Sequence, residues 1–145
     1  MIKNHKDLEV WKAAVELSVA CYDVTQAFPN TEQFGLVSQM RRAAISVASN
    51  IGEGAARAGN QEFIQFLYIS LASASELDTQ IEIARRVGLG KSADLQRLQL
   101  QANAVSRMLQ GLIRSVKQKR SRTNQQSPAT THQSLFAIHQ THEDR

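Results

Sequence analysis

The chain has few of the residues that interrupt helices, form disulfides or build strands. Its 145 residues include two prolines, seven glycines and a single cysteine, Cys21. One cysteine excludes a disulfide within the chain and suits a reducing compartment. Val, Ile and Thr do not alternate with polar residues, so strands have little support. We therefore expect long helices, with Cys21 as a small buried hydrophobic residue rather than a reactive thiol.

Long hydrophobic runs are missing as well. No stretch approaches the ~18 apolar residues of a membrane span. No apolar run follows the first seven residues, as it would in a signal peptide. The sequence therefore predicts a cytoplasmic protein with no membrane partner.

The chain also lacks the usual signs of a metal site or a hydrolase. Its histidines, which a metal site or a general base requires, all fall outside the helices predicted below: His5, His132, His139 and His142. No nucleophile elbow or Walker-type phosphate loop is present. The run Gly52-Glu53-Gly54 has no preceding strand, so we interpret it as close helix packing or local unwinding. We expect no enzyme activity, no cofactor, no small-molecule substrate and no metal. Weak metal binding by the tail histidines is the alternative, and a plain polar tail is favoured over it.

Four segments carry apolar residues at every third or fourth position, which predicts helices over residues 8–27, 34–56, 61–87 and 93–116. Aromatic residues make up only 6% of the chain, so the core should be mostly aliphatic. The predicted face of the first helix is Leu8, Trp11, Val15, Ser18 and Tyr22; the clearest seam, in the third, is Phe63, Leu67, Ser70, Ala74, Leu77, Ile81 and Ala84. Predicted end signals are the N-caps Asp7, Asn60 and Ser92 and the left-handed stop Gly88.

Three short loops joining four helices of similar length predict an all-α, antiparallel up-down-up-down four-helix bundle over residues 1–117. Residues 118–145 are polar and are predicted to be a flexible, disordered tail. Within this tail, residues 133–139 hold a small apolar cluster that is too short to be a stable helix alone.

Several motifs, taken in order, resemble those of a known family. Their residues are Asp7-Leu8-Glu9-Val10-Trp11, Phe28-Pro29, Phe34-Gly35-Leu36, Ser38-Gln39-Met40-Arg41-Arg42-Ala43-Ala44, Asn50-Ile51-Gly52-Glu53-Gly54, Arg57, Glu62-Phe63, Phe66-Leu67 and Glu76-Leu77-Asp78-Thr79-Gln80. Over most of residues 6–116 the chain resembles the bacterial four-helix-bundle proteins encoded in intervening sequences of 23S ribosomal RNA genes, the S23 proteins. Gly52, where that family usually has alanine, and Ser73 depart from its pattern.

The resemblance implies a four-helix bundle that assembles into a ring, commonly a pentamer, and a link to RNA. A more distant resemblance is to the accessory protein of diversity-generating retroelements, a basic pentameric bundle that works with a reverse transcriptase and nucleic acid. Residues after Lys117 lie outside the resemblance.

Two sets of basic residues are candidate nucleic-acid contacts. The first is Arg41, Arg42 and Arg57. An arginine fork fits a phosphate or a carboxylate equally well, so these arginines either contact phosphate or pair with acidic residues of neighbouring helices: Glu53, Glu62, Glu76 or Asp78. The second set is Arg107, Arg114, Lys117, Lys119, Arg120 and Arg122, with Arg85 and Arg86 adding charge near the end of the third helix. Cations also favour a helix C-terminus for electrostatic reasons alone.

The net charge of the chain does not decide between RNA binding and a protein–protein scaffold. Residues 1–117 hold 13 Lys/Arg and 11 Asp/Glu, and residues 118–145 hold 4 and 2, so the folded part is close to neutral. Stacking on bases requires exposed aromatic side chains, whereas Trp11, Tyr22, Phe63 and Phe66 are expected in the core. The remaining interpretations are a homo-oligomeric protein with RNA as partner and a protein–protein scaffold without nucleic acid.

Overall fold

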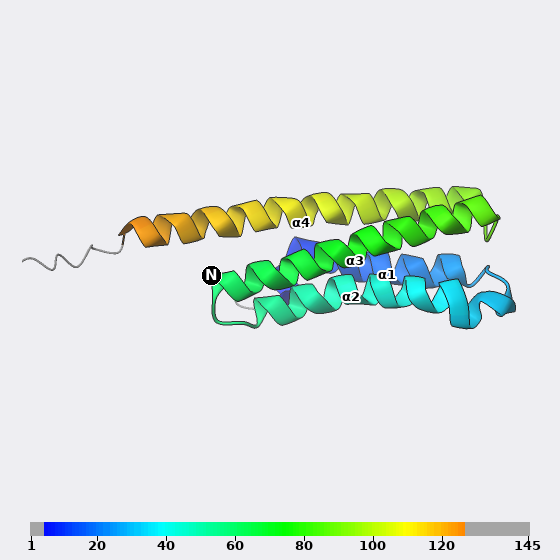
Figure 1. Ribbon diagram of the computed structural model, residues 1–145, viewed down its shortest axis with the longest axis horizontal. Coiled ribbons are helices and arrows are strands. Elements are labelled where there is room, and N and C mark those ends of the chain that lie inside the picture. Colours follow the sequence, from blue (N-terminus) through cyan, green and yellow to red (C-terminus); the bar gives the residue numbers. More distant parts are fainter. Residues whose placement is uncertain (1–4, 127–145) are drawn as a thin grey trace, which may run out of the picture.

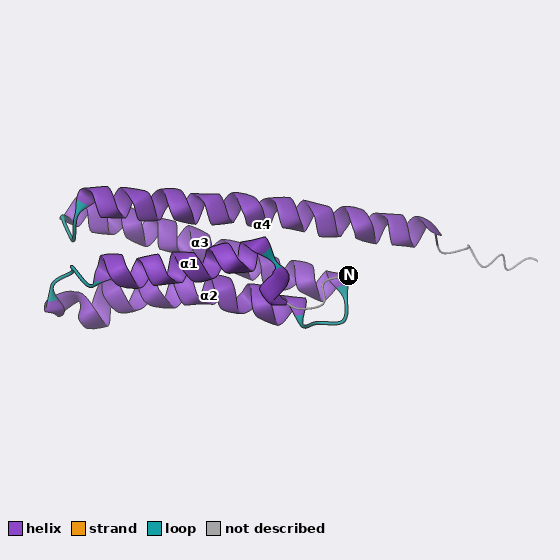
Figure 2. Cartoon of the chain, turned by 180° about the vertical axis from the view of Figure 1, so that it is seen from behind, coloured by secondary structure: helices purple, strands orange, loops and turns teal. Residues whose placement is uncertain are grey.

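The computed structural model describes residues 5–126, which form a bundle of four helices (Figure 1). The helices are α1 (Glu9–Thr25), α2 (Ser38–Ala55), α3 (Asn60–Val87) and α4 (Ser92–Gln126). Short turns precede α1 and α2: η1 (His5–Asp7), η2 (Asn30–Glu32) and η3 (Gln33–Val37). No strand occurs in this part of the chain, and successive helices run antiparallel around the bundle (Figure 2), as predicted. Within residues 5–126, no helix is both long and apolar enough to cross a membrane.

The core runs along the seam that the sequence predicts for α3. All seven seam residues of α3 are buried, and on α4 Leu95, Leu98, Ala102, Val105 and Leu109 are buried as well. Cys21 is completely buried, as expected. The middle of the α3 seam is small, at Ser70 and Ala74, which lets the neighbouring α2 come close.

The sequence predicts the wrong core face for α1. The face that is buried is rotated about the helix axis relative to the predicted one. The residues that point into the core are Val10, Ala14, Leu17, Cys21 and Thr25. Trp11 packs only partly against the core, with its ring edge-on to His5 at 5.1 Å between ring centroids. Tyr22 is 41% exposed, so its assignment to the core is wrong, whereas Phe63 is buried as expected and Phe66 is half-buried. Small side chains therefore fill the α1 core positions, and the large rings lie at its margins.

The helix starts also differ from the sequence prediction. The N-caps of α1 and α3 are Leu8 and Gly59, rather than Asp7 and Asn60, and neither cap makes a side-chain hydrogen bond. Ser92 is the first residue inside α4. α2 begins at Ser38, four residues later than predicted, because the preceding turn η3 contains a non-helical Gly35 at φ −103°, ψ −114°.

The C-terminal end of α3 lies where the sequence predicts it, whereas that of α4 does not. Gly88 ends α3 in the left-handed conformation, at φ 79°, as predicted. α4 continues ten residues beyond the predicted end at residue 116, up to Gln126. Polar residues alone do not stop a helix: residues 117–126 contain no Gly or Pro and several good helix formers, Lys, Arg and Gln.

This last part of α4, residues 117–126, projects past the loop that joins α2 to α3 (Figures 1 and 2). Every side chain in it is exposed. The first nine residues of the predicted disordered tail, 118–126, are therefore helical. Its remainder lies outside the described residues, together with its three histidines, His132, His139 and His142, and the apolar cluster at 133–139.

Candidate nucleic-acid interface

Charge is divided unevenly between α4 and the rest of the described chain. α4 holds seven Lys or Arg and one acidic residue, Asp94, whereas residues 5–91 hold eight Lys or Arg and ten Asp or Glu. Asp94 pairs with Arg97, so six cations of α4 remain uncompensated within the helix. They are Arg107, Arg114, Lys117, Lys119, Arg120 and Arg122, the six that the sequence predicts, and we call them the α4 basic strip.

The first three cations of the strip share one side of the helix. With 3.6 residues per turn, Arg107, Arg114 and Lys117 fall within an arc of about 80°. Lys119, Arg120 and Arg122 point to other sides, on the part of α4 that projects from the bundle. All six are exposed, and among residues 5–126 none of them makes an ion pair. The strip therefore presents unneutralised charge to solvent, which is the electrostatic footprint of a phosphate-binding surface.

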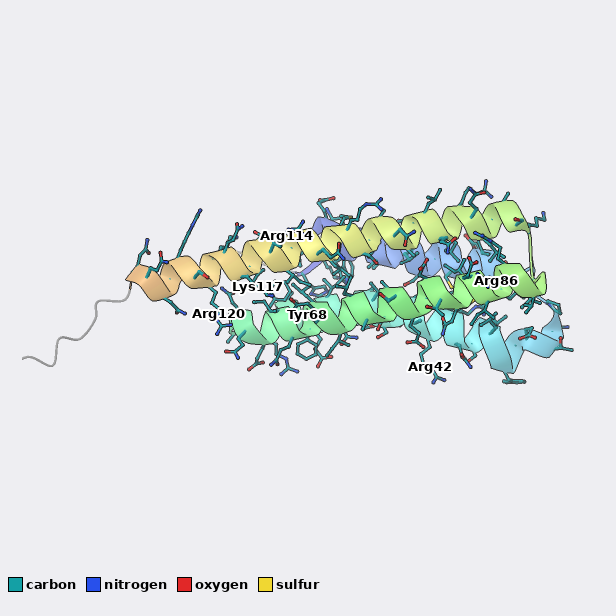
Figure 3. The ribbon with its side chains drawn as sticks, turned by 45° about the horizontal axis from the view of Figure 1, so that its top comes forward. Arg42, Tyr68, Arg86, Arg114, Lys117 and Arg120 are labelled. Atoms are coloured by element: carbon teal, nitrogen blue, oxygen red, sulfur yellow. The ribbon has the colours of Figure 1, made fainter. Side chains whose placement is uncertain are left out.

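One aromatic ring from α3 lies against the strip. The Nζ of Lys117 donates a hydrogen bond to the hydroxyl of Tyr68 at 2.6 Å and lies 5.1 Å from the centroid of its ring. Figure 3 shows Tyr68 of α3 beside Lys117, which lies between Arg114 and Arg120 on α4. Tyr68 is 45% exposed. The sequence argument did not consider it, although its place directly after the seam residue Leu67 indicates that it points away from the seam.

Arg57 lies in the α2–α3 loop, and acidic neighbours neutralise its charge. Its Nη2 donates to Glu53 at 2.9 Å, and its Nε lies 4.0 Å from Glu62. The guanidinium also lies 5.1 Å from the centroid of the Phe66 ring. Arg57 thus contacts two of the acidic residues that the sequence offered as partners, Glu53 of α2 and Glu62 of α3. Because these partners are largely exposed, each pair contributes at most about 1 kcal/mol to stability.

Arg41 is held by α1 rather than by a carboxylate. Its Nε donates to Thr25 Oγ1 at 2.9 Å, and its Nη2 donates to the carbonyl oxygen of Tyr22 at 3.5 Å. Its guanidinium lies 4.3 Å from the centroid of the Tyr22 ring. Arg41 therefore ties α2 to the C-terminal turn of α1, where the carbonyl oxygen of Tyr22 also accepts from the backbone N–H of Gln26. Within residues 5–126 of one chain, Arg41 makes no ion pair with an acidic residue.

Arg42 is exposed and has no hydrogen-bond or ion-pair partner within residues 5–126. Figure 3 places Arg42 and Arg86 near the end of the bundle opposite to Lys117 and Arg120. The acids proposed as partners for Arg42 are engaged elsewhere: Glu76 accepts from Gln80, and Asp78 accepts from Gln99. The first predicted set of arginines is thus divided, and its members do not join the α4 basic strip in one surface of the monomer.

Arg85 and Arg86 are compensated by Glu82, which lies 3.5 Å and 3.1 Å from them. The hydrogen bond from Arg86 is the largest cause that lowers the pKa of the Glu82 carboxyl, and the nearby charge of Arg85 adds to it. Arg85 also donates to Gln99 of α4 at 3.0 Å. Arg85 therefore connects α3 to α4, whereas Arg86 pairs within α3, and the single carboxylate of Glu82 offsets one of their two charges.

The described part of the chain assembles neither a metal site nor a reactive thiol. Residues 5–126 bring no three His, Cys, Asp or Glu side chains together around a metal position. Burial raises the pKa of the Cys21 thiol to about 12, so that it stays protonated at neutral pH. Gly54 marks a close helix contact, because a Cβ there would lie 2.6 Å from Phe66 Cβ. This supports the packing interpretation of Gly52-Glu53-Gly54.

Comparison with known proteins gives a family and a fold. The model of the 23S rRNA-intervening sequence protein family matches residues 6–111. A crystal structure of a protein of unknown function from the S23 ribosomal protein family of Bacteroides thetaiotaomicron is similar, with a TM-score of 0.68. It is 21% identical in sequence, and the match covers 72% of this chain and 95% of that one. Among curated proteins, none matches significantly.

Proposed function

We propose, from the premise that the chain belongs to the 23S rRNA-intervening sequence protein family, that it is a non-enzymatic, homo-oligomeric protein that binds structured RNA through the α4 basic strip. The observation that carries this proposal is the segregation of charge. Six unpaired cations lie on α4, while the described residues before α4 carry more acidic than basic side chains.

The side chains of the strip suit the phosphates of a nucleic-acid backbone rather than a single small anion. Arginine forks fit phosphate oxygens in two places, and lysine adds a mobile point charge. From Arg107 to Arg122 the strip extends about 22 Å at 1.5 Å per residue, which spans several successive phosphates of a polyanion. Such contacts position a nucleic acid without reading its sequence.

Assembly of several copies would strengthen this binding. The family resemblance leads us to propose a ring, of five copies by analogy. Support comes from apolar side chains left at the surface: Val19, Tyr22 and Ile45 line a groove between α1 and α2, and Ile69 and Ile83 lie exposed on α3. Contiguous exposed apolar surface is typical of subunit contacts. A ring repeats each basic strip, so modest individual affinities combine into a stronger one.

The experiment is binding of the purified protein to structured RNA from its own 23S transcript, against a shuffled control, across a salt series. The test variant replaces Lys117, Lys119, Arg120 and Arg122 with Gln. Its matched control replaces Arg42, Arg85, Arg86 and Lys91 with Gln, which removes the same charge at the other end of the bundle. We expect only the first variant to weaken binding markedly and to flatten the salt dependence, by about 0.7–0.9 in the logarithmic slope per lost phosphate contact.

Equal losses in the two variants would mean that bulk charge, not the strip, attracts the RNA. Binding of neither RNA by the wild-type protein would remove the RNA function. Light scattering on the same samples tests the assembly, and a stable monomer would contradict the ring.

A protein–protein scaffold without nucleic acid is the alternative, and the apolar groove between α1 and α2 is the observation that favours it. Its test is recovery of a defined protein partner in a pull-down treated with nuclease. Replacing Val19 and Ile45 with Asp should abolish that recovery. Material that disappears on nuclease treatment would count against the scaffold.

A further inference from the structure

Tyr68 has an environment that packing of the bundle alone does not require. It lies outside the buried seam of α3, and nearly half of its surface is accessible to solvent. Its hydroxyl is nevertheless fixed from the neighbouring helix by Lys117, at 2.6 Å. An aromatic ring that is exposed and also held in place loses little conformational entropy when a flat partner binds it.

The surroundings of the ring are basic on one side and uncharged on the other. α4 contributes Lys117, with Arg114 and Arg120 one turn before and after it in the sequence (Figure 3). On α3, the exposed residues one and two turns before Tyr68 are Gln65 and Gln61. The nearest acidic residue along α3, Glu62, lies 4.0 Å from Arg57. The ring is therefore bordered by positive charge.

Proteins bind flexible single-stranded nucleic acids with such a combination of an exposed aromatic ring and neighbouring cations. The ring stacks on a base, while the cations hold the phosphates on either side of it. A continuous duplex cannot use the ring, because its bases are already stacked on one another.

We infer that Tyr68 is a stacking platform for an unpaired base, so that the α4 basic strip prefers single-stranded segments such as the loops and bulges of a structured RNA. This inference rests on the proposed function and deepens it. The phosphate contacts of the strip serve both kinds of RNA, whereas the Tyr68 contact serves only the unpaired one.

The test compares two probes and two substitutions at one position. The probes are an unstructured RNA of about 20 nucleotides, longer than the ~4–16 nucleotides that one single-strand site covers, and the same RNA annealed to its complement. Tyr68→Phe keeps the ring and removes the hydroxyl that Lys117 holds. Tyr68→Leu removes the ring and keeps an apolar side chain. Thermal melting of all three proteins confirms that they are folded.

We expect Tyr68→Leu to weaken binding of the single strand by about fivefold or more, the loss typical of one stacked base. Duplex binding should change by less than about twofold, because its phosphate contacts are intact. Tyr68→Phe keeps the ring but loses the bond that holds it, so its loss on the single strand should be clearly smaller than that of Tyr68→Leu.

Four results would overturn the inference. Equal loss on both probes would show that Tyr68 only positions Lys117, and no loss on either would show that the ring takes no part. A loss in Tyr68→Phe as large as in Tyr68→Leu would assign the effect to the hydroxyl. If the wild-type protein bound neither probe at low salt, the proposed function itself would fail, and this inference with it.

Discussion

The hydroxyl of Ser70 donates a hydrogen bond to the carbonyl oxygen of Val47 at 2.8 Å, across the buried contact between α3 and α2. A second polar contact lies one turn further along, where the hydroxyls of Ser46 and Ser73 are 2.8 Å apart. Small side chains allow these backbones to approach, and their hydroxyls satisfy polar atoms that the approach would otherwise leave buried. The α2–α3 pair is thus specified by small polar residues as well as by apolar ones.

Ser70→Leu should therefore destabilise the protein strongly. The larger side chain overpacks the interface at about 1–3 kcal/mol, and loss of the hydrogen bond adds about 1 kcal/mol. The matched control is Ser75→Leu on the exposed side of α3, which should change the free energy of unfolding by less than about 0.5 kcal/mol. Urea unfolding at one protein concentration measures both. Similar values for the two variants would mean that α3 is rotated relative to the structure described here.

The two glycines of Gly52-Glu53-Gly54 should respond in opposite directions to alanine. A Cβ at Gly54 would lie 2.6 Å from Phe66 Cβ and 3.1 Å from the Phe63 ring, whereas a Cβ at Gly52 meets its nearest neighbour, His5, at an ordinary 3.5 Å. Gly54→Ala should cost about 1–3 kcal/mol by overpacking. Gly52→Ala should stabilise by up to about 1 kcal/mol through helix propensity. Thermal melting compares the two, and stabilisation by Gly54→Ala would refute the close contact.

The buried thiol of Cys21 should make stability fall at alkaline pH. Burial raises its pKa from 9.0 to about 12, although the charge of Arg41 opposes the rise. Between these values the unfolded chain releases the proton and the folded protein keeps it. The contribution is therefore complete below about pH 9 and is lost as the pH rises, by at most about 1.4 kcal/mol per pH unit.

Cys21→Ala supplies the reference for that measurement, because its other titrating groups are those of the wild type. The difference in unfolding free energy between the two proteins should shrink as the pH rises above about 9. A constant difference would contradict the prediction. So would rapid reaction of the native protein with a thiol reagent at neutral pH.

The end of α4 should tolerate a helix breaker that its middle does not. Residues 117–126 are exposed on all sides, so Ser121→Pro should leave the global free energy of unfolding within about 0.5 kcal/mol of the wild type. Gln110→Pro, in the part of α4 that packs on the bundle, should cost about 3 kcal/mol or more. Hydrogen exchange should be fast in residues 118–126 of the wild type. Strong protection there would show that a partner or a second copy covers this segment.

The sequence predicted the helices and their order because α3 and α4 each carry one continuous seam. It failed at α1, where Val15 and Val19 form a second apolar surface beside the true core face. Periodicity alone could not choose between the two faces, and the size of Trp11 and Tyr22 favoured the wrong one. The end of α4 was also predicted too early, because its polar residues were interpreted as a disordered tail. A solvated helix of Lys, Arg and Gln has the same composition as such a tail.

At the candidate site the sequence identified the cations but not their surroundings. A count of basic residues does not show that Arg57 and Arg86 are neutralised by carboxylates or that Arg41 is bound to α1. Those outcomes depend on which helix faces meet. Tyr68 was missed for the same reason, since its contact with Lys117 joins residues that are 49 positions apart.

The separation of charge between α4 and the helices before it also makes the molecule an electric dipole. A polyanion would be attracted to α4 and repelled by Glu16 and Asp23 of α1, which make no ion pair within residues 5–126, whereas Glu9 pairs with Lys12. The resulting torque acts within about one Debye length, ~8 Å at physiological salt, before any side chain makes contact. If the partner is the proposed RNA, this separation of charge would turn α4 toward it during the encounter and raise the association rate.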